Sequence, residues 1–392
     1  MDQTTNVVPF TSGKFDDIED FLRVRPAIAV FVAVVQFILF IGHAVVYGTW
    51  IQLWGAPNAS ALVWLRLTFA ILSVSFVAMS ILAFWFSNPF VRVFYRIAAA
   101  WIGFLNFVLC AALLSWITYG LARLVGWRGS DRAIIAAFYG IAVIVSIYGI
   151  INAGRVRIKR ISAKLPNLPQ SWRGRAAVFV SDTHLGHVHN YGFSRRIATM
   201  VSDLRPDIVF IGGDLYDGTL ADLSRLAQPW SRSPAPLGTY FVAGNHEEFT
   251  DPAKYFDAVR SAGIRVLNNE KLIVDGVQIV GVDYRTSVRP RRFESMLREA
   301  NLDPKRPSIL LSHAPNRLPI AERAGISLQL SGHTHRGQLI PARWIVERIF
   351  GPYAYGLHLF GNMMVYTSSG AGTWGPPLRV GTDPEIVVIR FE

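Results

Sequence analysis

Residues 208–218 read IVFIGGDLYDG, and this stretch decides how the second half of the chain folds. Its first four residues form a short β-rich run, which is typical of a strand. Gly212 and Gly213 then allow a sharp turn and a close approach of the backbone. Asp214 and Asp217 follow directly, so the sequence places two carboxylates where a strand ends.

The same pattern recurs along the rest of this half. Four further β-rich runs, 176–180, 239–242, 308–311 and 328–330, each end in polar residues. The polar groups that follow are Asp182-Thr183-His184, Gly244-Asn245-His246-Glu247, Ser312-His313 and Gly332-His333-Thr334-His335. Helical signals lie between several of the runs, which indicates an α/β fold. Open α/β sheets bind ligands at the carboxyl ends of their strands, so we expect these side chains at one edge.

Together these groups predict a metal site for phosphate chemistry. Mixed imidazole, carboxylate and amide ligands suit Mn, Fe or Zn better than Mg or Ca. Two such ions about 3.5–4 Å apart can clamp a phosphoryl group and activate a bridging water. One carboxylate must then bridge the ions, and Asp214 is central in the order. A single Asp-X-His motif is usually an ordinary turn, but five groups in order after strands argue against coincidence.

As an ordered set, these motifs resemble those of the calcineurin-like metallophosphoesterase superfamily. The resemblance covers about residues 176–392 and implies an αββα domain, two mixed β-sheets flanked by helices, with two divalent metal ions. It implies one ion bound by Asp182, His184 and His335, a second bound by Asn245, His313 and His333, and Asp214 bridging both. It also implies that His246 is catalytic and stabilises or protonates the leaving oxygen. Asp217 would orient a histidine, and Glu247 would be structural.

A narrower similarity lies near the C-terminus. His335-Arg336-Gly337-Gln338 and the run SGAGTWGPPLR at 369–379 are similar to a membrane-associated bacterial branch of that superfamily. Some of its members act on phospholipid-like or nucleotide-linked lipid substrates. Many relatives have glycine where this chain has Arg336, which adds either a phosphate contact or a surface charge. Arg379 and His187 are further candidate substrate contacts.

The first half of the chain predicts an α-helical transmembrane bundle. Four apolar runs, about 27–50, 62–86, 97–125 and 133–152, each suffice for a helix of about 20 residues that crosses a membrane. The expected organisation is an N-terminal cytoplasmic segment (1–26), four transmembrane helices (27–154), a basic juxtamembrane linker (155–175) and the phosphoesterase domain (176–392). A hydrophobic fraction of 51% agrees with a membrane-embedded portion.

Basic residues predict the orientation in the membrane. The net charge is +12, and the strongest cluster (Arg155, Arg157, Lys159, Arg160, Lys164) follows the fourth run. An even number of spans then places both termini in the cytoplasm, at a bacterial inner membrane. Arg123, Arg128 and Arg132, between the third and fourth runs, favour the opposite orientation.

Cys110 is the only cysteine, so no disulfide within the chain is possible.

Polar residues within or beside the apolar runs leave two alternatives open. His43 and Arg66 could serve conduction or binding, or their side chains could simply extend to the membrane surface. A second open question concerns residues 340–353, where Trp344, Ile345, Ile349 and Phe350 could share one helical face. That helix either packs on a sheet or lies in the membrane interface and guides a lipid-linked phosphate to the metals.

The sequence thus favours a membrane-anchored phosphohydrolase that cleaves a phosphoester, phosphodiester or pyrophosphate bond by attack of a metal-bridging hydroxide. Its expected partners are membrane lipids and a phosphate-containing substrate, with a lipid-linked one favoured. The main alternative is a transport or regulatory membrane protein that carries a phosphoesterase-like domain, but few intramembrane charges argue against transport. The complete ligand set argues against a scaffold. No nucleic acid is expected, because basic residues gather at the membrane junction and not in a stripe with interleaved aromatics.

Overall fold

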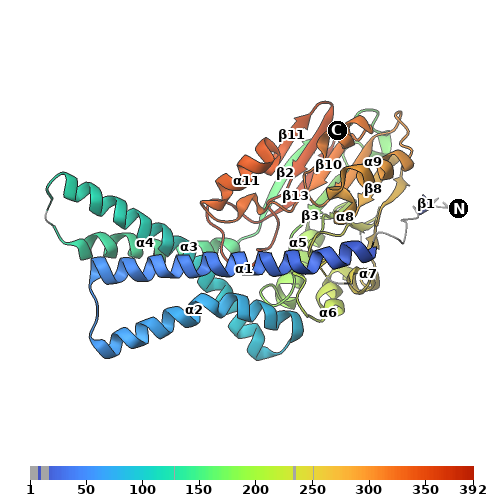
Figure 1. Cartoon of the computed structure of the whole chain (residues 1–392). Coiled ribbons are helices and arrows are strands. Elements are labelled where there is room, and N and C mark those ends of the chain that lie inside the picture. The colour runs from blue at the N-terminus through green and yellow to red at the C-terminus, as the bar shows by residue number, and fades with distance from the viewer. Residues whose placement is uncertain (1–7, 10–16, 128, 233–234, 250) are drawn as a thin grey trace. The chain divides into compact units, whose positions relative to one another are not determined.

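The structure is a computed structural model that describes residues 8–9, 17–127, 129–232, 235–249 and 251–392, so Arg128 lies outside the described residues. The chain forms two compact units, each described by itself. The sheet unit comprises Met1–Thr11, Asn152–Trp374 and Gly381–Glu392. The helical unit comprises Ser12–Ile151 and Gly375–Val380. Figure 1 labels the helices and strands of both units.

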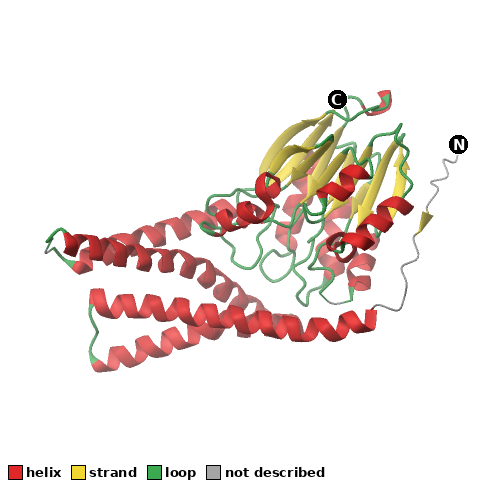
Figure 2. Ribbon diagram, turned by 45° about the horizontal axis from the view of Figure 1, so that its top comes forward, coloured by secondary structure: helices red, strands yellow, loops and turns green. Residues whose placement is uncertain are grey.

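Two β-sheets form the centre of the sheet unit, as Figure 2 shows. The six-stranded sheet has the order β2-β13-β3-β4-β5-β6. Its strands are β2 (Arg157–Ala163), β13 (Glu385–Phe391), β3 (Ala176–Val180), β4 (Ile208–Ile211), β5 (Thr239–Phe241) and β6 (Arg265–Val266). The seven-stranded sheet has the order β1-β7-β8-β9-β10-β12-β11. Its strands are β1 (Val8–Pro9), β7 (Glu270–Val274), β8 (Val277–Val282), β9 (Ser308–Ser312), β10 (Leu328–Ser331), β12 (Met363–Thr367) and β11 (Gly356–Phe360).

Three hydrophobic cores hold the layers together. The core between the sheets joins residues such as Phe179 and Phe210 of one sheet to Ile309 and Leu330 of the other. The outer cores pack helices on each sheet. These helices are α5 (Tyr191–Asp203), α6 (Leu223–Ala227) and α7 (Pro252–Ser261) on one side, and α9 (Pro290–Glu299) and α10 (Leu318–Arg323) on the other. The order helix, sheet, sheet, helix confirms the predicted αββα class.

Parallel pairing brings the predicted strand ends to common edges. β3 pairs in parallel with β4, and β4 with β5, so these strands end side by side. In the other sheet β9 pairs in parallel with β10. The polar loops that follow these five strands therefore leave the two sheets at corresponding edges.

The basic stretch at 155–175 differs from the predicted linker. Arg157–Ala163 forms β2, which pairs in parallel with β13 from Arg157↔Glu385 to Ala163↔Phe391. β2 is an edge strand, so its charged side chains stay exposed while Ala163 is buried. Lysine and arginine are common on edge strands, and their charge concealed the strand in the sequence. Trp172, later in this stretch, is fully buried between the sheets.

The helical unit contains four helices that are long and apolar enough to cross a membrane. They are α1 (Asp17–Thr49), which continues as a π-helical turn to Trp54, α2 (Ala59–Trp85), α3 (Pro89–Leu124) and α4 (Asp131–Ala153). The Asn58 side chain caps α2 and the Asn88 side chain caps α3, each by accepting a backbone N–H. The Asn88 cap and Pro89 explain why α3 begins before residue 97.

One short segment from far along the chain belongs to the helical unit. Gly375–Val380 packs against α3 and α4, where the Arg379 backbone N–H donates to the Gly149 carbonyl oxygen at 2.9 Å. A Cβ atom on Gly103 would lie 2.6 Å from a Leu378 methyl group, and one on Gly149 would lie 2.8 Å from a Val380 methyl group. These two glycines therefore provide the space that the segment occupies.

Candidate metal centre

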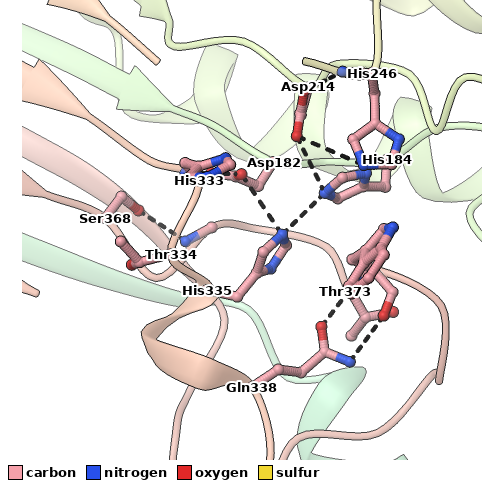
Figure 3. Close-up of polar contacts among 12 residues, drawn as sticks. Asp182, His184, Asp214, His246, His333, Thr334, His335, Gln338, Ser368 and Thr373 are labelled. Carbon is pink, nitrogen blue, oxygen red and sulfur yellow. Dashed lines mark hydrogen bonds and ion pairs between the residues drawn. The ribbon is translucent and has the colours of Figure 1, made fainter. Parts of the chain in front are cut away.

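Five loops of the sheet unit bring the predicted ligands into one cluster (Figure 3). Among the described residues, three overlapping groups have ligand atoms within 4.8 Å of one another. They are Asp182 with His184 and His335, His184 with Asp214 and His246, and Asp214 with His313 and His333. His184 and Asp214 each belong to two of these groups, and the bridging role of Asp214 stays a prediction.

The distances in the cluster suit metal coordination. Nε2 of His184 and Nε2 of His335 lie 2.9 Å apart, and Asp182 Oδ1 lies 3.5 Å from the latter. On the other side, His333 Nδ1 lies 3.0 Å from Asn245 Oδ1. Two ligands that are each about 2.1 Å from one ion lie about 3.0–3.4 Å apart at right-angled or tetrahedral geometry. The residues therefore fit two neighbouring ions.

His313 gives the strongest indication that a cation belongs here. Its Nδ1 lies 2.8 Å from the Gly212 carbonyl oxygen, which can only accept, so Nδ1 carries the proton. Its Nε2 lies 3.1 Å from Asp214 Oδ2 and 4.0 Å from Asp182 Oδ1, without a hydrogen bond. Two buried carboxylates this close to Nε2 require positive charge at that nitrogen, either a proton or a bound cation.

The pKa shifts agree with this electrostatic arrangement. Burial is the largest single influence on the pKa of His313 and lowers it, but the Asp214 and Asp182 carboxylates and the Gly212 carbonyl together outweigh burial and raise this pKa to about 10. Burial and the neighbouring His313 lower the pKa of His333 to about 4, and burial lowers the pKa of His184. Neutral imidazoles are the form that binds metals, so His184 and His333 are ready as ligands. Between Asp214 and His313, a metal ion would replace the proton.

The backbone of the cluster is strained where the ligands lie. Asp182, His184, Asp214, His333 and His335 all have positive φ, between 46° and 68°. Non-glycine residues rarely adopt this left-handed conformation, and such strain gathers at functional sites. The surrounding fold must hold these residues in place.

Glu247 helps to fix these loops in place. Its buried carboxylate accepts backbone N–H groups from Asp214, Tyr216 and Gly244 at 2.8–3.0 Å. These hydrogen bonds join the loop after β4 to the loop after β5. Glu247 therefore has a structural role, as the sequence predicted.

His246 lies beside the bridging position and faces it. Its Nδ1 donates to the backbone oxygen of Asp217 at 2.8 Å, which leaves Nε2 pointing to Asp214 Oδ2 at 3.9 Å. The Asp217 carboxylate itself accepts the backbone N–H groups of Thr219 and His187. Asp217 thus orients His246 through its main chain, a detail that the motif does not reveal.

Several aromatic residues near the centre were not predicted. Phe249 and Trp374 contact the His246 ring, with ring centroids 4.5 and 6.3 Å away. Gln338 holds Trp374 with two hydrogen bonds to its backbone N–H and carbonyl group. Tyr284, the first residue of α8 (Tyr284–Val288), lies 5.5 Å from the His333 ring. These contacts join distant loops, so no local sequence signal marks them.

The three candidate substrate contacts occupy different places. The Arg336 guanidinium lies 4.2 Å from the Tyr355 ring centroid, and its Nε lies 3.9 Å from Glu347, which favours a structural role. His187 is buried beside Asp217. Arg379 is buried in the segment that packs within the helical unit. None of the metal-ligand groups includes these residues, and their contact with substrate stays a prediction.

Comparison with known proteins identifies the family. A sequence model described as calcineurin-like phosphoesterase matches residues 177–337. An uncharacterized metallophosphoesterase of Aquifex aeolicus is 31% identical over 257 residues, which cover 64% of this chain and 98% of that protein. The chain belongs to the calcineurin-like phosphoesterase family. This confirms the resemblance seen in the motifs and agrees with the groups that could hold metal ions.

Relatives of this phosphoesterase include a membrane protein. The zebrafish protein named "Transmembrane protein with metallophosphoesterase domain" is 34% identical over 278 residues, which cover 67% of this chain and 63% of that protein. An uncharacterized metallophosphoesterase of Campylobacter jejuni is 31% identical over 239 residues, 60% of this chain and 63% of that protein. The chain thus spans less than two thirds of the length of these two relatives. Its four apolar helices make it a membrane protein.

Proposed function

We propose that this protein is a membrane-anchored phosphohydrolase with a dinuclear metal centre. The observation that supports it best is the position of His313 Nε2, which lies 3.1 Å from Asp214 Oδ2 and 4.0 Å from Asp182 Oδ1 inside a cluster of predicted ligands. Asp182, His184 and His335 would hold one ion, Asn245, His313 and His333 the other, and Asp214 both. Mn, Fe or Zn suits these ligands, and two such ions would activate water and polarise the phosphoryl group.

The remaining residues of the site would act on the leaving group. His246 Nε2 is 3.9 Å from the bridging carboxylate, so it can reach an oxygen of a phosphate seated there. The backbone oxygen of Asp217 fixes this ring by accepting a hydrogen bond from Nδ1. Phe249 and Trp374 pack beside the ring, with ring centroids 4.5 and 6.3 Å away, and would help to hold its orientation. His246 would therefore donate a proton or a hydrogen bond to the departing oxygen.

The test is hydrolysis of bis(4-nitrophenyl) phosphate by the full chain in detergent, with Mn²⁺ added or chelated. Asp214→Asn and His246→Ala should each remove metal-dependent turnover. His358→Ala, which changes a histidine of β11 outside the cluster, should keep it. If the metal-loaded protein hydrolyses neither this diester nor lipid phosphates, the proposal is wrong and the centre serves binding or regulation.

We further propose that the substrate is lipid-linked. The helix α11 (Ala342–Phe350) has no buried residue, and Trp344, Ile345 and Ile349 are each more than 60% exposed. The same helix ends at Phe350, whose ring centroid is 6.4 Å from that of His333. An exposed apolar face that leads to a metal ligand suits an interfacial helix that delivers lipid phosphates. This favours the interfacial alternative over a helix packed on a sheet.

We also propose that the metal centre faces the cytoplasm of a bacterial cell, at the inner membrane. Four spans place the segments before α1 and after α4 on the same side. The basic residues of 155–164 follow α4 at once, and such residues remain in the cytoplasm. The test introduces a cysteine by Ser162→Cys in a Cys110→Ser background and treats intact cells with an impermeant thiol reagent. Labelling of this cysteine would contradict the orientation.

A further inference from the structure

A groove between α1 and α2 has the features of a binding site that the phosphoesterase family does not explain. It has a volume of about 220 Å³ and lies wholly within the helical unit. Phe40, Ala44, Phe69 and Ala70 form its apolar part, and His43, Tyr47, Arg66 and Ser73 its polar part. Small-molecule pockets usually exceed about 300 Å³, so the groove suits only part of a larger ligand.

Arg66 is a cation without a protein counter-charge. The sequence contains no Asp or Glu between Asp20 and Asp131, and among the described residues Arg66 forms no ion pair. Its Nε donates to the Tyr47 hydroxyl at 3.1 Å, which fixes one edge of the guanidinium group. The guanidinium stays charged in proteins and presents further N–H donors to the groove. Its charge is therefore available to an anionic ligand in the groove.

His43, the other side chain of the groove that could carry positive charge, has hydrogen-bond partners at both ring nitrogens. The indole N–H of Trp101 can only donate, so His43 Nε2 accepts it at 2.9 Å. His43 Nδ1 then carries the proton and donates to the Leu39 carbonyl oxygen at 2.7 Å. The ring is neutral and forms a wall of the groove. Arg66 alone supplies positive charge there.

The depth of Arg66 suits a lipid head group. Arg66 is seven residues after Ala59, the start of α2, which corresponds to about 10 Å along the helix axis. The hydrocarbon core is about 30 Å thick, so the guanidinium lies between the α1–α2 connection and the membrane centre. An arginine side chain can extend from there toward the phosphate groups of that leaflet. Acyl chains would then lie along the apolar part of the groove.

We propose that this groove binds a membrane phospholipid, with Arg66 contacting its phosphate group and Phe40 and Phe69 its acyl chain. The ligand is a lipid and not free phosphate, because half of the lining is apolar and the groove belongs to a membrane-spanning unit. The α1–α2 connection and the end of α4 lie at opposite ends of the bundle by chain order. The groove lies in the helical unit and the metal ligands belong to the sheet unit, so lipid binding in the groove does not depend on hydrolysis.

The test is native mass spectrometry of the full chain in detergent. Phosphatidylglycerol, or a diacylglycerol with the same acyl chains but no phosphate, is added before the detergent is removed in the instrument. The wild type should retain one phosphatidylglycerol and no diacylglycerol. Arg66→Gln should lower the bound fraction about tenfold, which is what loss of one charge-assisted contact produces. Arg132→Gln removes an arginine that instead donates to the Trp54 carbonyl oxygen, outside the groove, and should retain the lipid.

The outcomes separate the alternatives. Equal retention by wild type and Arg66→Gln would show that Arg66 only extends to the membrane surface, and this would overturn the proposal. Inorganic phosphate that binds without lipid, or diacylglycerol that binds as well as phospholipid, would also overturn it. Tyr47→Phe keeps the charge and frees the guanidinium, so it should weaken retention less than Arg66→Gln. It provides a second measurement should Arg66→Gln fail to fold.

Discussion

His184 and His335 point their Nε2 atoms at each other across 2.9 Å, although 151 residues separate them in the chain. Their rings are close to parallel, with centroids 4.9 Å apart and an interplanar angle of 28°. Two neutral imidazole nitrogens need a shared proton or a shared cation at this distance. The Asp182 carboxylate on the same side favours the cation.

Metal removal should therefore destabilise the folded protein, because His184 and His335 would lose the cation that they share. We expect chelation to lower the melting temperature of the full chain, and Mn²⁺ or Zn²⁺ to restore it, because a ligand that binds only the folded state stabilises it. In His335→Ala the response to metal should shrink, whereas in His358→Ala it should remain. Differential scanning fluorimetry with and without chelator measures this. An unchanged melting temperature of the wild type after complete chelation would contradict the prediction.

Replacement of Glu247 by glutamine should destabilise the protein without removing a metal ligand. The amide nitrogen of glutamine would face a backbone N–H that the carboxylate now accepts. An unsatisfied buried donor costs about 1–3 kcal/mol. We expect a lower denaturation midpoint and weaker metal binding, measured by chemical unfolding and by metal titration. Glu294→Gln, at an exposed position of α9, is the matched control and should behave as wild type.

Polar substitutions on α11 should separate lipid substrates from soluble ones. Trp344→Ser with Ile349→Ser removes two exposed apolar side chains but no group near the metals. We expect slower hydrolysis of lipid phosphates in mixed micelles and unchanged hydrolysis of bis(4-nitrophenyl) phosphate. The comparison of kcat/KM for both substrates is the measurement. An equal loss on both would mean that α11 supports the fold and does not bind lipid.

Two glycines on α4 should respond in opposite directions to alanine. Alanine favours a helix over glycine by about 1 kcal/mol, and a Cβ on Gly140 would meet no atom within 4 Å. Gly140→Ala should be neutral or stabilising. On Gly149 the Cβ would press on Val380, and overpacking of this kind costs about 1–3 kcal/mol. Gly149→Ala should therefore melt at a lower temperature in detergent. Equal melting temperatures of Gly149→Ala and the wild type would show that Gly375–Val380 can shift to accommodate the added methyl group.

The sequence predicted those features that depend on local pattern. Strands β3 and β4 begin and end at the predicted residues, because short β-rich runs ended by glycine or polar residues are clear signals. The order of the ligand motifs then indicated both the αββα fold and the family. The motifs also named the residues whose ligand atoms lie within 4.8 Å of one another, whereas the bridging role of Asp214 stays a prediction.

Features that depend on distant contacts escaped prediction. Tyr284 reaches the centre from the start of α8, which follows no recognisable motif. Trp374 lies in the run 369–379, but the similarity of that run gave no sign of its contact with His246. The exposed basic side chains of β2 concealed that strand. The left-handed backbone at Asp182 and His335 follows from tertiary constraints, since local preference opposes it. Burial of Leu378 and Arg379 within a helical unit has no sequence signal either.

The burial of Leu378 and Arg379 within the helical unit limits where the chain can be truncated. A shortened chain that begins after α4 would look like a complete phosphoesterase domain by motif. It would nevertheless carry Gly375–Val380 without α3 and α4, and Leu378, fully buried in the intact protein, would meet water. Trp374, which contacts the His246 ring, directly precedes this segment. A chain shortened in this way would therefore be prone to aggregation, and Trp374 would lose its fixed position beside His246. Inactivity of the shortened chain would not show that the full chain is inactive.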